Sequence, residues 1–401
     1  VAGDSPQIRV PEANDGLKAQ GRSERLEKGY QGALSRFRQV QKSDPIRGIV
    51  ISFGWAGMAV SKGPIFDPSS WGLKPEQSDY EADADGYESA MNEYEARKRT
   101  EWPFYWEICD PRYIFADPGT HGRKWVIQAF ERRVGEIAAQ WPKWDKRTKG
   151  MSAADPSMPD DAKVPWVEYW DEHYRAYMVG GEFIDDVRPH RYGKPPFQIY
   201  SAGLGKESSF FPVERYRSML FPVRNLLDAE IKTASQLSVM IRNTAWTTML
   251  TVRNTGLTEM KPGKVVQMTS AEAIAAVRPL TEYRPEVFQG IMAHGANISD
   301  WIEEGTYPKV VKGVKAHGIA SGYGQNSLVA QAKVKFGSVA VALQWILSEF
   351  FSDLARCVEN VVEEPVPVWG PLAGGFVDCT IDPKDIGGYY YNIVTVNPSV
   401  P

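Results

Sequence analysis

Two long amphipathic stretches constrain the fold of this chain more than any other feature of its sequence. Apolar residues recur in steps of three and four from residue 213 to 249, and again from residue 326 to 364. That spacing is the period of a helix with one apolar face. The first stretch alone would form a rod of about 36 residues, roughly 55 Å long, whereas the mean globular helix has about 11–12 residues. The sequence therefore predicts two helices of unusual length.

Strand-forming segments surround these helices, so the chain as a whole is predicted to be an α+β protein. The predicted strands are an apolar run at 48–60, a short strand within 110–118, a strand at 124–132, an aromatic–polar meander at 166–187, strands within 249–268, and a strand pair within 378–396. Further helices are predicted at 23–38, 133–141 and 285–304. The meander is supported by its alternating side chains and its Gly180-Gly181 turn, because successive strand residues face opposite sides of a sheet.

The charge balance and the cysteine content exclude some classes of protein. The chain has 46 Lys and Arg against 50 Asp and Glu, a net charge of −4. It is therefore not a uniformly basic nucleic-acid binder, although a local basic surface is compatible with this balance. Cys109, Cys357 and Cys379 cannot form a complete disulfide framework, which favours a reducing compartment. No apolar stretch approaches the about 18 residues of a membrane-spanning helix, so no membrane segment is expected.

The motifs that usually carry catalysis or bind cofactors do not occur in this sequence. A P-loop fails because Gly205-Lys206 is followed by Glu207, and the dinucleotide, zinc-protease and nucleophile-elbow motifs are missing. The five histidines lack metal-ligand spacing. The acidic run at 81–86 fails as a calcium loop because its twelfth position is Asn92 instead of Glu. We therefore expect no cofactor and no metal site, and interpret the acidic run as a solvated face.

Charge is distributed unevenly along the chain. Residues 63–118 carry 13 acidic and five basic side chains, whereas residues 305–340 carry five lysines and no acid. The densest part of this second run consists of Lys309, Val310, Val311, Lys312, Val314 and Lys315. A loop that presents ammonium groups to phosphates is one interpretation, because lysine accepts any phosphate geometry. A merely solvated loop is the alternative.

The order of the predicted elements resembles that of the portal (head-to-tail connector) proteins of tailed double-stranded DNA bacteriophages. A β-rich segment leads to a long helix, a small insertion, a shorter helix, a loop rich in glycine and lysine, a second long helix and closing strands. The resemblance spans about residues 45–398. It includes the strings Asp110-Pro111-Arg112-Tyr113-Ile114-Phe115-Ala116-Asp117-Pro118, Arg132-Arg133-Val134-Gly135-Glu136-Ile137, His190-Arg191-Tyr192-Gly193-Lys194-Pro195-Pro196-Phe197 and Ile319-Ala320-Ser321-Gly322.

The resemblance implies a portal-type fold with a β-rich wing, long stem helices, a small α/β clip, a tunnel loop and a long helix. The implied segments are the N-terminal part of the wing at 1–211, a stem helix at 212–248, the clip at 249–283, a second stem helix at 284–304, the tunnel loop at 305–324, a long wing helix at 325–364 and the C-terminal strands of the wing at 365–401. The helical crown of many portals is expected to be absent or not covered. The Val at position 1 suggests a longer chain that was trimmed.

The resemblance also implies a non-enzymatic, structural function. Portals are rings of about twelve copies at one capsid vertex, where double-stranded DNA passes during packaging and ejection. Their partners are the large terminase and the capsid and neck or adaptor proteins, and they assemble in the cytoplasm of the bacterial host. Carried over, the channel residues are Lys309, Val310, Val311, Lys312, Val314 and Lys315, and the clip residues for partner docking are Arg253, Lys261 and Lys264.

Two other functions remain open at the level of sequence. The first is a soluble, aromatic-rich hydrolase or carbohydrate-active enzyme with catalytic acids between Asp67 and Asp186. A monomer cleft with two carboxylates about 5–10 Å apart would favour it. The second is another assembly protein, such as a neck adaptor, for which two such long helices are less expected.

Overall fold

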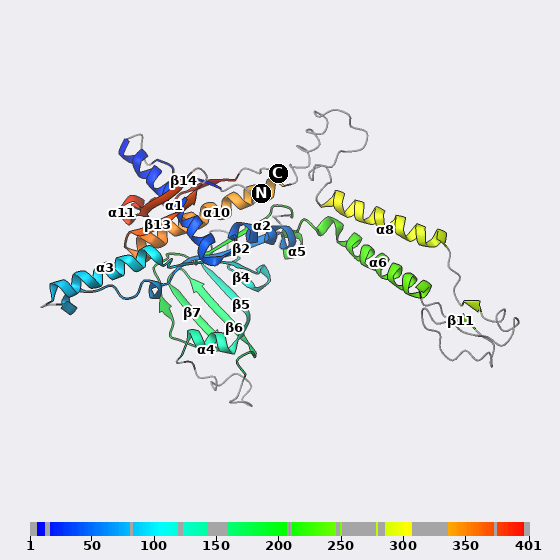
Figure 1. Ribbon diagram of the computed structural model, residues 1–401, viewed down its shortest axis with the longest axis horizontal. Helices are drawn as coiled ribbons and strands as arrows, with labels where there is room; N and C mark the ends of the chain where they lie inside the picture. The colour runs from blue at the N-terminus through cyan, green and yellow to red at the C-terminus, as the bar shows by residue number, and fades with distance from the viewer. Residues whose placement is uncertain are drawn as a thin grey trace. The chain divides into compact units, whose positions relative to one another are not determined.

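The computed structural model divides the chain into two compact units, Val1–Ser218 together with Lys335–Pro401, and Met219–Val334 (Figure 1). The residues that the structure describes are 6–12, 17–80, 83–118, 123–142, 144, 159–206, 208, 211–245, 249–250, 278–279, 285–306, 336–372 and 375–396. Both helices and strands are well represented in this part of the chain, and every strand pair is antiparallel, as expected for an α+β protein.

The first unit combines helices with four antiparallel sheets. Its helices are α1 (Leu17–Gln41), α2 (Pro45–Ala56), α3 (Ala84–Thr100), α4 (Val134–Gln140), α5 (Pro212–Arg215), α10 (Gly337–Cys357) and α11 (Pro383–Ile386). Its strands are β1 (Gln7–Arg9), β2 (Met58–Phe66), β3 (Phe104–Cys109), β4 (Ile114–Ala116), β5 (Trp125–Arg133), β6 (Lys163–Asp171), β7 (Tyr174–Val179), β8 (Glu182–Phe183), β9 (Arg188–Pro189), β10 (Phe197–Ser201), β13 (Val366–Leu372), β14 (Gly375–Ile381) and β15 (Ile393–Thr395).

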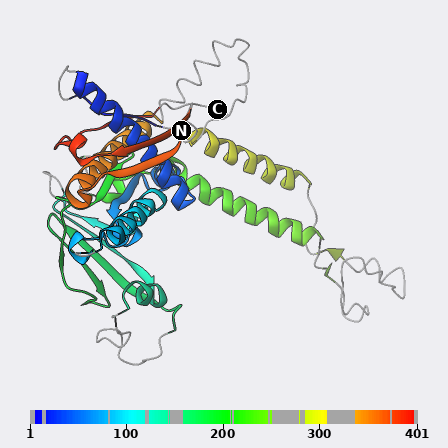
Figure 2. The ribbon, with the colours of Figure 1, turned by 60° about the vertical axis from the view of Figure 1, so that its left-hand side comes forward.

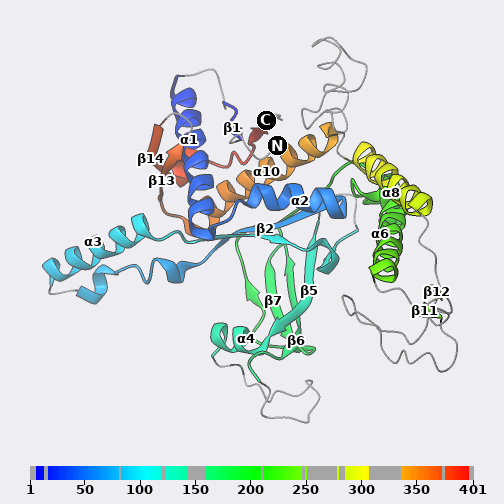
Figure 3. The ribbon, with the colours of Figure 1, turned by 45° about the vertical axis from the view of Figure 1, so that its right-hand side comes forward.

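Two of these sheets shape the region discussed below. The smaller one has the order β10–β2–β3, and the larger one has the order β4–β5–β6–β7–β8, with β9 paired to β7. Strands β5, β6 and β7 extend away from the level of β2 (Figure 3). The other two sheets are the hairpin β13–β14 and the pair β1–β15, which joins the two ends of the unit.

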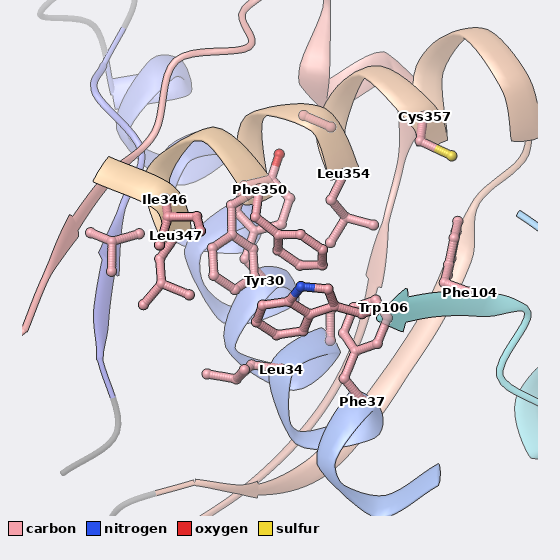
Figure 4. Close-up of a cluster of buried hydrophobic side chains, with 14 of the residues drawn as sticks. Tyr30, Leu34, Phe37, Phe104, Trp106, Ile346, Leu347, Phe350, Leu354 and Cys357 are labelled. Atoms are coloured by element: carbon pink, nitrogen blue, oxygen red, sulfur yellow. The ribbon is translucent and has the colours of Figure 1, made fainter. Parts of the chain in front are cut away.

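The main hydrophobic core forms around α10, whose side chains between Val339 and Cys357 are largely buried. Trp106 of β3 stacks on Phe350 with ring centroids 3.9 Å apart, and Phe37 of α1 meets both rings edge-on (Figure 4). Stacked and edge-to-face aromatic pairs are the favoured geometries for such rings. This cluster therefore fixes α1, β3 and α10 against one another.

A second, smaller cluster lies at one end of the larger sheet. It is formed by residues of α4, β5, β6 and β7, with Trp166 as its largest fully buried member. Trp170, two turns of the pleat along β6, belongs to the main core instead. The same sheet therefore takes part in two separate hydrophobic clusters, and a polar layer lies between them.

The second unit contains a helical hairpin. Its described elements are the 3₁₀ turn η4 (Phe221–Val223), α6 (Arg224–Ala245), β11 (Met249–Leu250), β12 (Arg278–Pro279) and α8 (Pro285–Gly305). Helices α6 and α8 pack side by side (Figure 2), and β11 pairs with β12 where the two helices connect. Gly305 lets the end of α8 approach η4, because a Cβ there would meet Val223 Cγ1 at 2.3 Å, which is not printed as a contact of any real Cβ.

The apolar run at 48–60, for which the sequence predicts a strand, is a helix in its first half. Residues Pro45–Ala56 form α2 before β2 begins. The side chain of Asp44 caps the first turn, and Pro45 occupies the position where a missing N–H costs nothing. Gly57 ends the helix with a φ of 73°. A continuous apolar run does not distinguish a buried helix from a buried strand, so the capping residues were the better indicators.

The first long helix is shorter than predicted. The regular helix α6 begins at Arg224, so the predicted rod is wrong before that residue, where the short helix α5 and the turn η4 stand instead. Pro222 explains the break, because proline lacks an N–H and disfavours helical conformation in the residue before it.

The second long helix is confirmed only in its described part. Helix α10 covers Gly337–Cys357 and continues into the π-helical turn η6 (Val358–Val362) before Pro365. Residues 326–335 lie outside the described residues.

The acidic region contains a helix that was not predicted, α3. Its N-cap is Asp83, whose side chain accepts a hydrogen bond from the Gly86 N–H at 2.8 Å. The acidic run once compared with a calcium loop is therefore the start of a helix, where carboxylates interact favourably with the helix dipole.

Several shorter predictions are confirmed. The strand at 124–132 is β5, the helix at 133–141 is α4, the meander is β6–β7–β8, and the helices at 23–38 and 285–304 lie within α1 and α8. The predicted pairing of the two C-terminal strands is wrong. Strand β14 pairs with β13, and β15 pairs with β1, far away in the sequence.

Candidate functional site

A basin of about 1000 Å³ opens on the first unit between the larger sheet and the strands β2 and β3. We call it the basin. Its lining combines aromatic and charged side chains in similar numbers. The aromatic residues are Phe66, Tyr105, Trp106, Phe130, Trp141, Trp166 and Tyr177, and the charged residues are Lys62, Asp67, Glu107, Arg132, Glu168, Arg175, Asp185 and Arg188. A volume of this size lies at the upper end of ordinary ligand pockets.

The strand register explains why the sheet residues of the basin share one face. Residues directly opposite in an antiparallel pair point to the same side. Gln128 lies opposite Glu168, which lies opposite Tyr177, and Trp170 lies opposite Arg175, which lies opposite Arg188. The alternation of side chains along each strand then places every second residue on that face.

A buried ion pair lies between the two sheets at the basin. Lys62 of β2 is 9% exposed, and its Nζ donates to Glu168 Oε2 at 2.7 Å and to Gln128 Oε1 at 3.2 Å. Glu107 Oε2 is 3.8 Å from the same nitrogen. Burial lowers the pKa of Lys62, but the charges of Glu168 and Glu107 outweigh it and raise the pKa above its ordinary value. The ammonium group is therefore held in its charged form.

The carboxylate of Glu168 is further fixed by the indole of Trp170, whose Nε1 donates to Glu168 Oε1 at 2.5 Å. Both oxygens of this buried carboxylate are thus hydrogen-bonded, as a buried charge requires. This network connects β2, β5 and β6 through side chains alone.

Three arginines of the basin differ in how they are paired. Arg188 forms an ion pair with Asp185. Arg132 lies over the Trp166 ring at 4.9 Å and donates to Gln140 Oε1 at 2.8 Å, while its nearest carboxylate, Glu136, is 3.7 Å away.

Arg175 is the least satisfied of the three. It lies over the Trp170 ring at 5.5 Å, and its buried Nε has no hydrogen-bond partner among the described residues. Arg132 and Arg175 are therefore cations whose charge no close carboxylate neutralises within the described part of the chain, and they can receive an anionic group from outside.

The basin also bears on the hydrolase hypothesis, because it holds two carboxylates close together. Glu107 and Glu168 approach the same Lys62 nitrogen, so they are no farther apart than the carboxylate pairs of glycosidases, about 5–9.5 Å. Such an enzyme needs one of the two in its protonated form. The charged Lys62 between them favours the ionised form of both, so this pair offers no proton to a leaving group.

The second unit presents a surface of a different kind. Apolar side chains on α6 and α8 remain exposed, although the two helices pack on each other. The exposed ones are Ile231, Val239, Ile241, Val287, Met292 and Trp301, with Ile231 at 65% and Trp301 at 55%. Of the described residues of this unit, only Val223, Thr233 and Ile298 are buried. A helix pair with such a surface is typical of an interface.

The residues that the sequence assigned to function lie elsewhere. Lys309, Val310, Val311, Lys312, Val314 and Lys315 of the tunnel loop, and Arg253, Lys261 and Lys264 of the clip, all lie outside the described residues. The basin was not predicted. The nearest indication was the abundance of aromatic residues between Trp55 and Trp170, whose alternation on β6 places Trp166, Glu168 and Trp170 on one face.

Among the described residues, no group of three or more His, Cys, Asp and Glu side chains is placed to hold a metal ion. None of the helices in this part of the chain is long and apolar enough to cross a membrane. The chain matches no protein-family model. No curated protein matches its sequence either.

Proposed function

We propose that this chain is the subunit of a structural portal ring at a capsid vertex, through which double-stranded DNA is packaged and ejected. In this function the chain is not an enzyme. The second unit forms the stem and clip, and the first unit forms the wing. The large terminase and the neck or adaptor proteins dock on the ring, which assembles in the host cytoplasm and becomes part of the virion.

The observation that carries this proposal is the exposed apolar surface of α6 and α8. Two helices packed only on each other leave Ile231, Val239 and Trp301 in water. Each fully buried side chain of this size contributes about 1.5–3 kcal/mol, so a neighbouring copy that covers them would stabilise the assembly. A closed ring satisfies every copy in the same way, because each subunit then has a neighbour on both sides.

The order of elements supports the same proposal. A β-rich body leads to α6, an excursion through β11 and β12, the return helix α8, and then α10 within the body. A hairpin of helices inserted between two parts of one compact unit is what a stem requires, because the stem must leave the wing and return to it.

Ring formation is tested by native mass spectrometry and negative-stain imaging of the purified chain. We expect a closed ring of about twelve copies. A monomer that persists at micromolar concentration and shows no ring would contradict the proposal.

The lysine run gives a separate test of DNA conduction. Lys309→Ala, Lys312→Ala and Lys315→Ala together remove three cations per subunit, and ring symmetry multiplies the loss. We expect rings of normal mass with altered packaging or retention of DNA in an assembly assay, because salt-screened contacts of lysine with phosphate do not hold the subunits together. Lys206→Ala, which removes a lysine of the first unit, is the control. Unchanged packaging in the triple variant would remove this loop from the mechanism.

A further inference from the structure

The first unit carries a projecting acidic segment. We call it the acidic arm: the 3₁₀ turn η2 (Gln77–Tyr80) and the first part of α3, from its N-cap Asp83 to Glu88. Helix α3 extends away from the sheets, with its N-terminal end farthest out (Figures 1 and 3). Its C-terminal half is fixed to the body, where Lys98 forms an ion pair with Glu364 at 3.0 Å. The arm itself reaches past this anchor.

The acidic arm is charged and exposed rather than packed. Asp79, Asp83, Asp85 and Glu88 are exposed, and its one ring contact in the described residues is internal, between Tyr80 and Tyr87 at 5.9 Å. The described arm carries no Lys or Arg. A short helix start that packs on nothing gains little from its own chain, so a partner that covers it would stabilise it.

The basin of the same unit has the complementary character. Arg132 and Arg175 lack a carboxylate at hydrogen-bond distance, and aromatic side chains such as Tyr105 and Trp141 lie beside them. No residue of the arm contributes to the basin lining. The chain thus has an unneutralised acidic, tyrosine-bearing segment and a separate basin with unneutralised arginines and aromatic rings.

We propose that the acidic arm of one copy docks into the basin of a neighbouring copy, with arm carboxylates on Arg132 and Arg175. The two surfaces differ, so the contact is head-to-tail, and a head-to-tail contact repeated around an axis closes a ring. Guanidinium–carboxylate pairs are strong where they are shielded from water, and the tyrosines of the arm would pack on the basin aromatics. This inference rests on the proposed ring, because the ring supplies the neighbouring copy.

Reciprocal charge reversal tests the contact. Asp85→Lys with Glu88→Lys reverses the arm, and Arg132→Glu with Arg175→Glu reverses the basin. We expect each pair to raise the concentration needed for ring assembly at least about tenfold, because like charges then meet across the contact. The combination of all four changes should restore much of the assembly. Glu24→Lys and Arg47→Glu, exposed positions outside both surfaces, are the matched controls.

A peptide experiment separates this contact from the ring itself. A synthetic peptide of residues 76–92 contains no tryptophan, so its binding to the full chain with the reversed arm can be followed by tryptophan fluorescence. We expect saturable binding that weakens at least about tenfold with Arg132→Glu and Arg175→Glu.

The outcomes of these experiments are distinct. Rings that assemble equally well with a reversed arm, or a peptide that does not bind, overturn the arm–basin contact while the portal proposal stands. Saturable peptide binding without any ring supports the contact and contradicts the portal. The arm variant also guards against misfolding as the explanation, because its two positions are exposed and its melting curve can be compared with that of the parent chain.

Discussion

At the scale of single residues, the first unit depends on buried charges that each have several partners. Lys62 joins the two sheets through Glu168 and Gln128. Asp353 joins α10 to the neighbouring strand, because Gln198 Nε2 donates to its Oδ2 at 2.8 Å and Lys194 Nζ lies 2.9 Å from its Oδ1. A charge removed from such a group leaves its partner unpaired in the interior.

Replacement of Lys62 tests the first of these groups. Lys62→Met should destabilise the first unit by about 3–5 kcal/mol, because Glu168 is left as an uncompensated buried charge. Lys62→Met combined with Glu168→Gln should recover more than half of that loss, since no charge then remains in the layer. Urea unfolding followed by tryptophan fluorescence measures both, with Lys124→Met at an exposed position as the control. Equal losses in the single and double variants would show that the ion pair is not the cause.

Asp353 predicts a pH dependence of stability. Burial raises the pKa of Asp353 to about 6, and Glu349 adds to this, while Lys194 opposes it. Arg356 is the other charged group nearby, 3.5 Å from the carboxylate. A carboxyl with a raised folded-state pKa binds its proton more tightly in the folded protein, so its contribution to stability is present below its ordinary pKa and is lost as the pH rises to about 6.

The variant Asp353→Asn should lack this dependence. Relative to the variant, the parent chain should gain about 1–3 kcal/mol between pH 7 and pH 4. The comparison isolates Asp353 because Asp110, Asp171 and Glu364, whose pKa values are lowered, act in the opposite direction in both proteins. Asp378→Asn, an exposed carboxylate, serves as the control. A stability difference that does not change with pH would refute the assignment.

At the scale of elements, what could be predicted depended on whether local chemistry decided the outcome. The meander at β6–β8 followed from alternation and a Gly-Gly turn, and α4 and α8 from their periodicity. Helix α2 was mistaken for a strand because its apolar side chains surround the helix, and only its caps distinguish it. The basin could not be predicted, because it depends on how two sheets meet, and no local pattern records that.

The two glycines of α2 give a matched test of its C-cap. Gly57 has a φ of 73°, and a Cβ there would meet the Arg217 carbonyl oxygen at 2.3 Å, whereas nothing lies within 4 Å of a Cβ at Gly54. Gly57→Ala should therefore cost about 1–3 kcal/mol or more. Gly54→Ala should be neutral or stabilising by up to about 1 kcal/mol, because alanine is the better helix former. Thermal unfolding distinguishes the two, and similar melting temperatures would contradict the cap.

At the scale of the whole molecule, the two units call for different kinds of stabilisation. The first has a main core around α10 that joins residues from both ends of the chain. The second buries few of its described side chains and leaves apolar ones exposed on both helices. In physical terms the first unit is stable through its own contacts, while the second gains most from a neighbour.

Assembly should therefore be sensitive to α6 and α8 where folding is not. Ile231→Glu with Trp301→Glu should shift the chain from rings to monomers, because a carboxylate is costly to bury in an apolar interface. The melting temperature of the monomer should change little, since both side chains are exposed in a single copy. Gln236→Glu adds a charge on α6 without removing an apolar group and is the control for charge alone. Sedimentation velocity reports the outcome, and unaltered rings would place the interface elsewhere.

The two hydrophobic clusters of the larger sheet have a consequence for how the protein opens. The cluster around Trp166 is separated from the main core by the polar layer of Lys62, Gln128 and Glu168. Regions joined through few apolar contacts can lose their structure as separate cooperative units. Amide hydrogens of α4 and of the neighbouring strand ends should then exchange faster, and together, than those of α10. The far end of this sheet would be a part of the subunit that can yield under load while the rest keeps its shape.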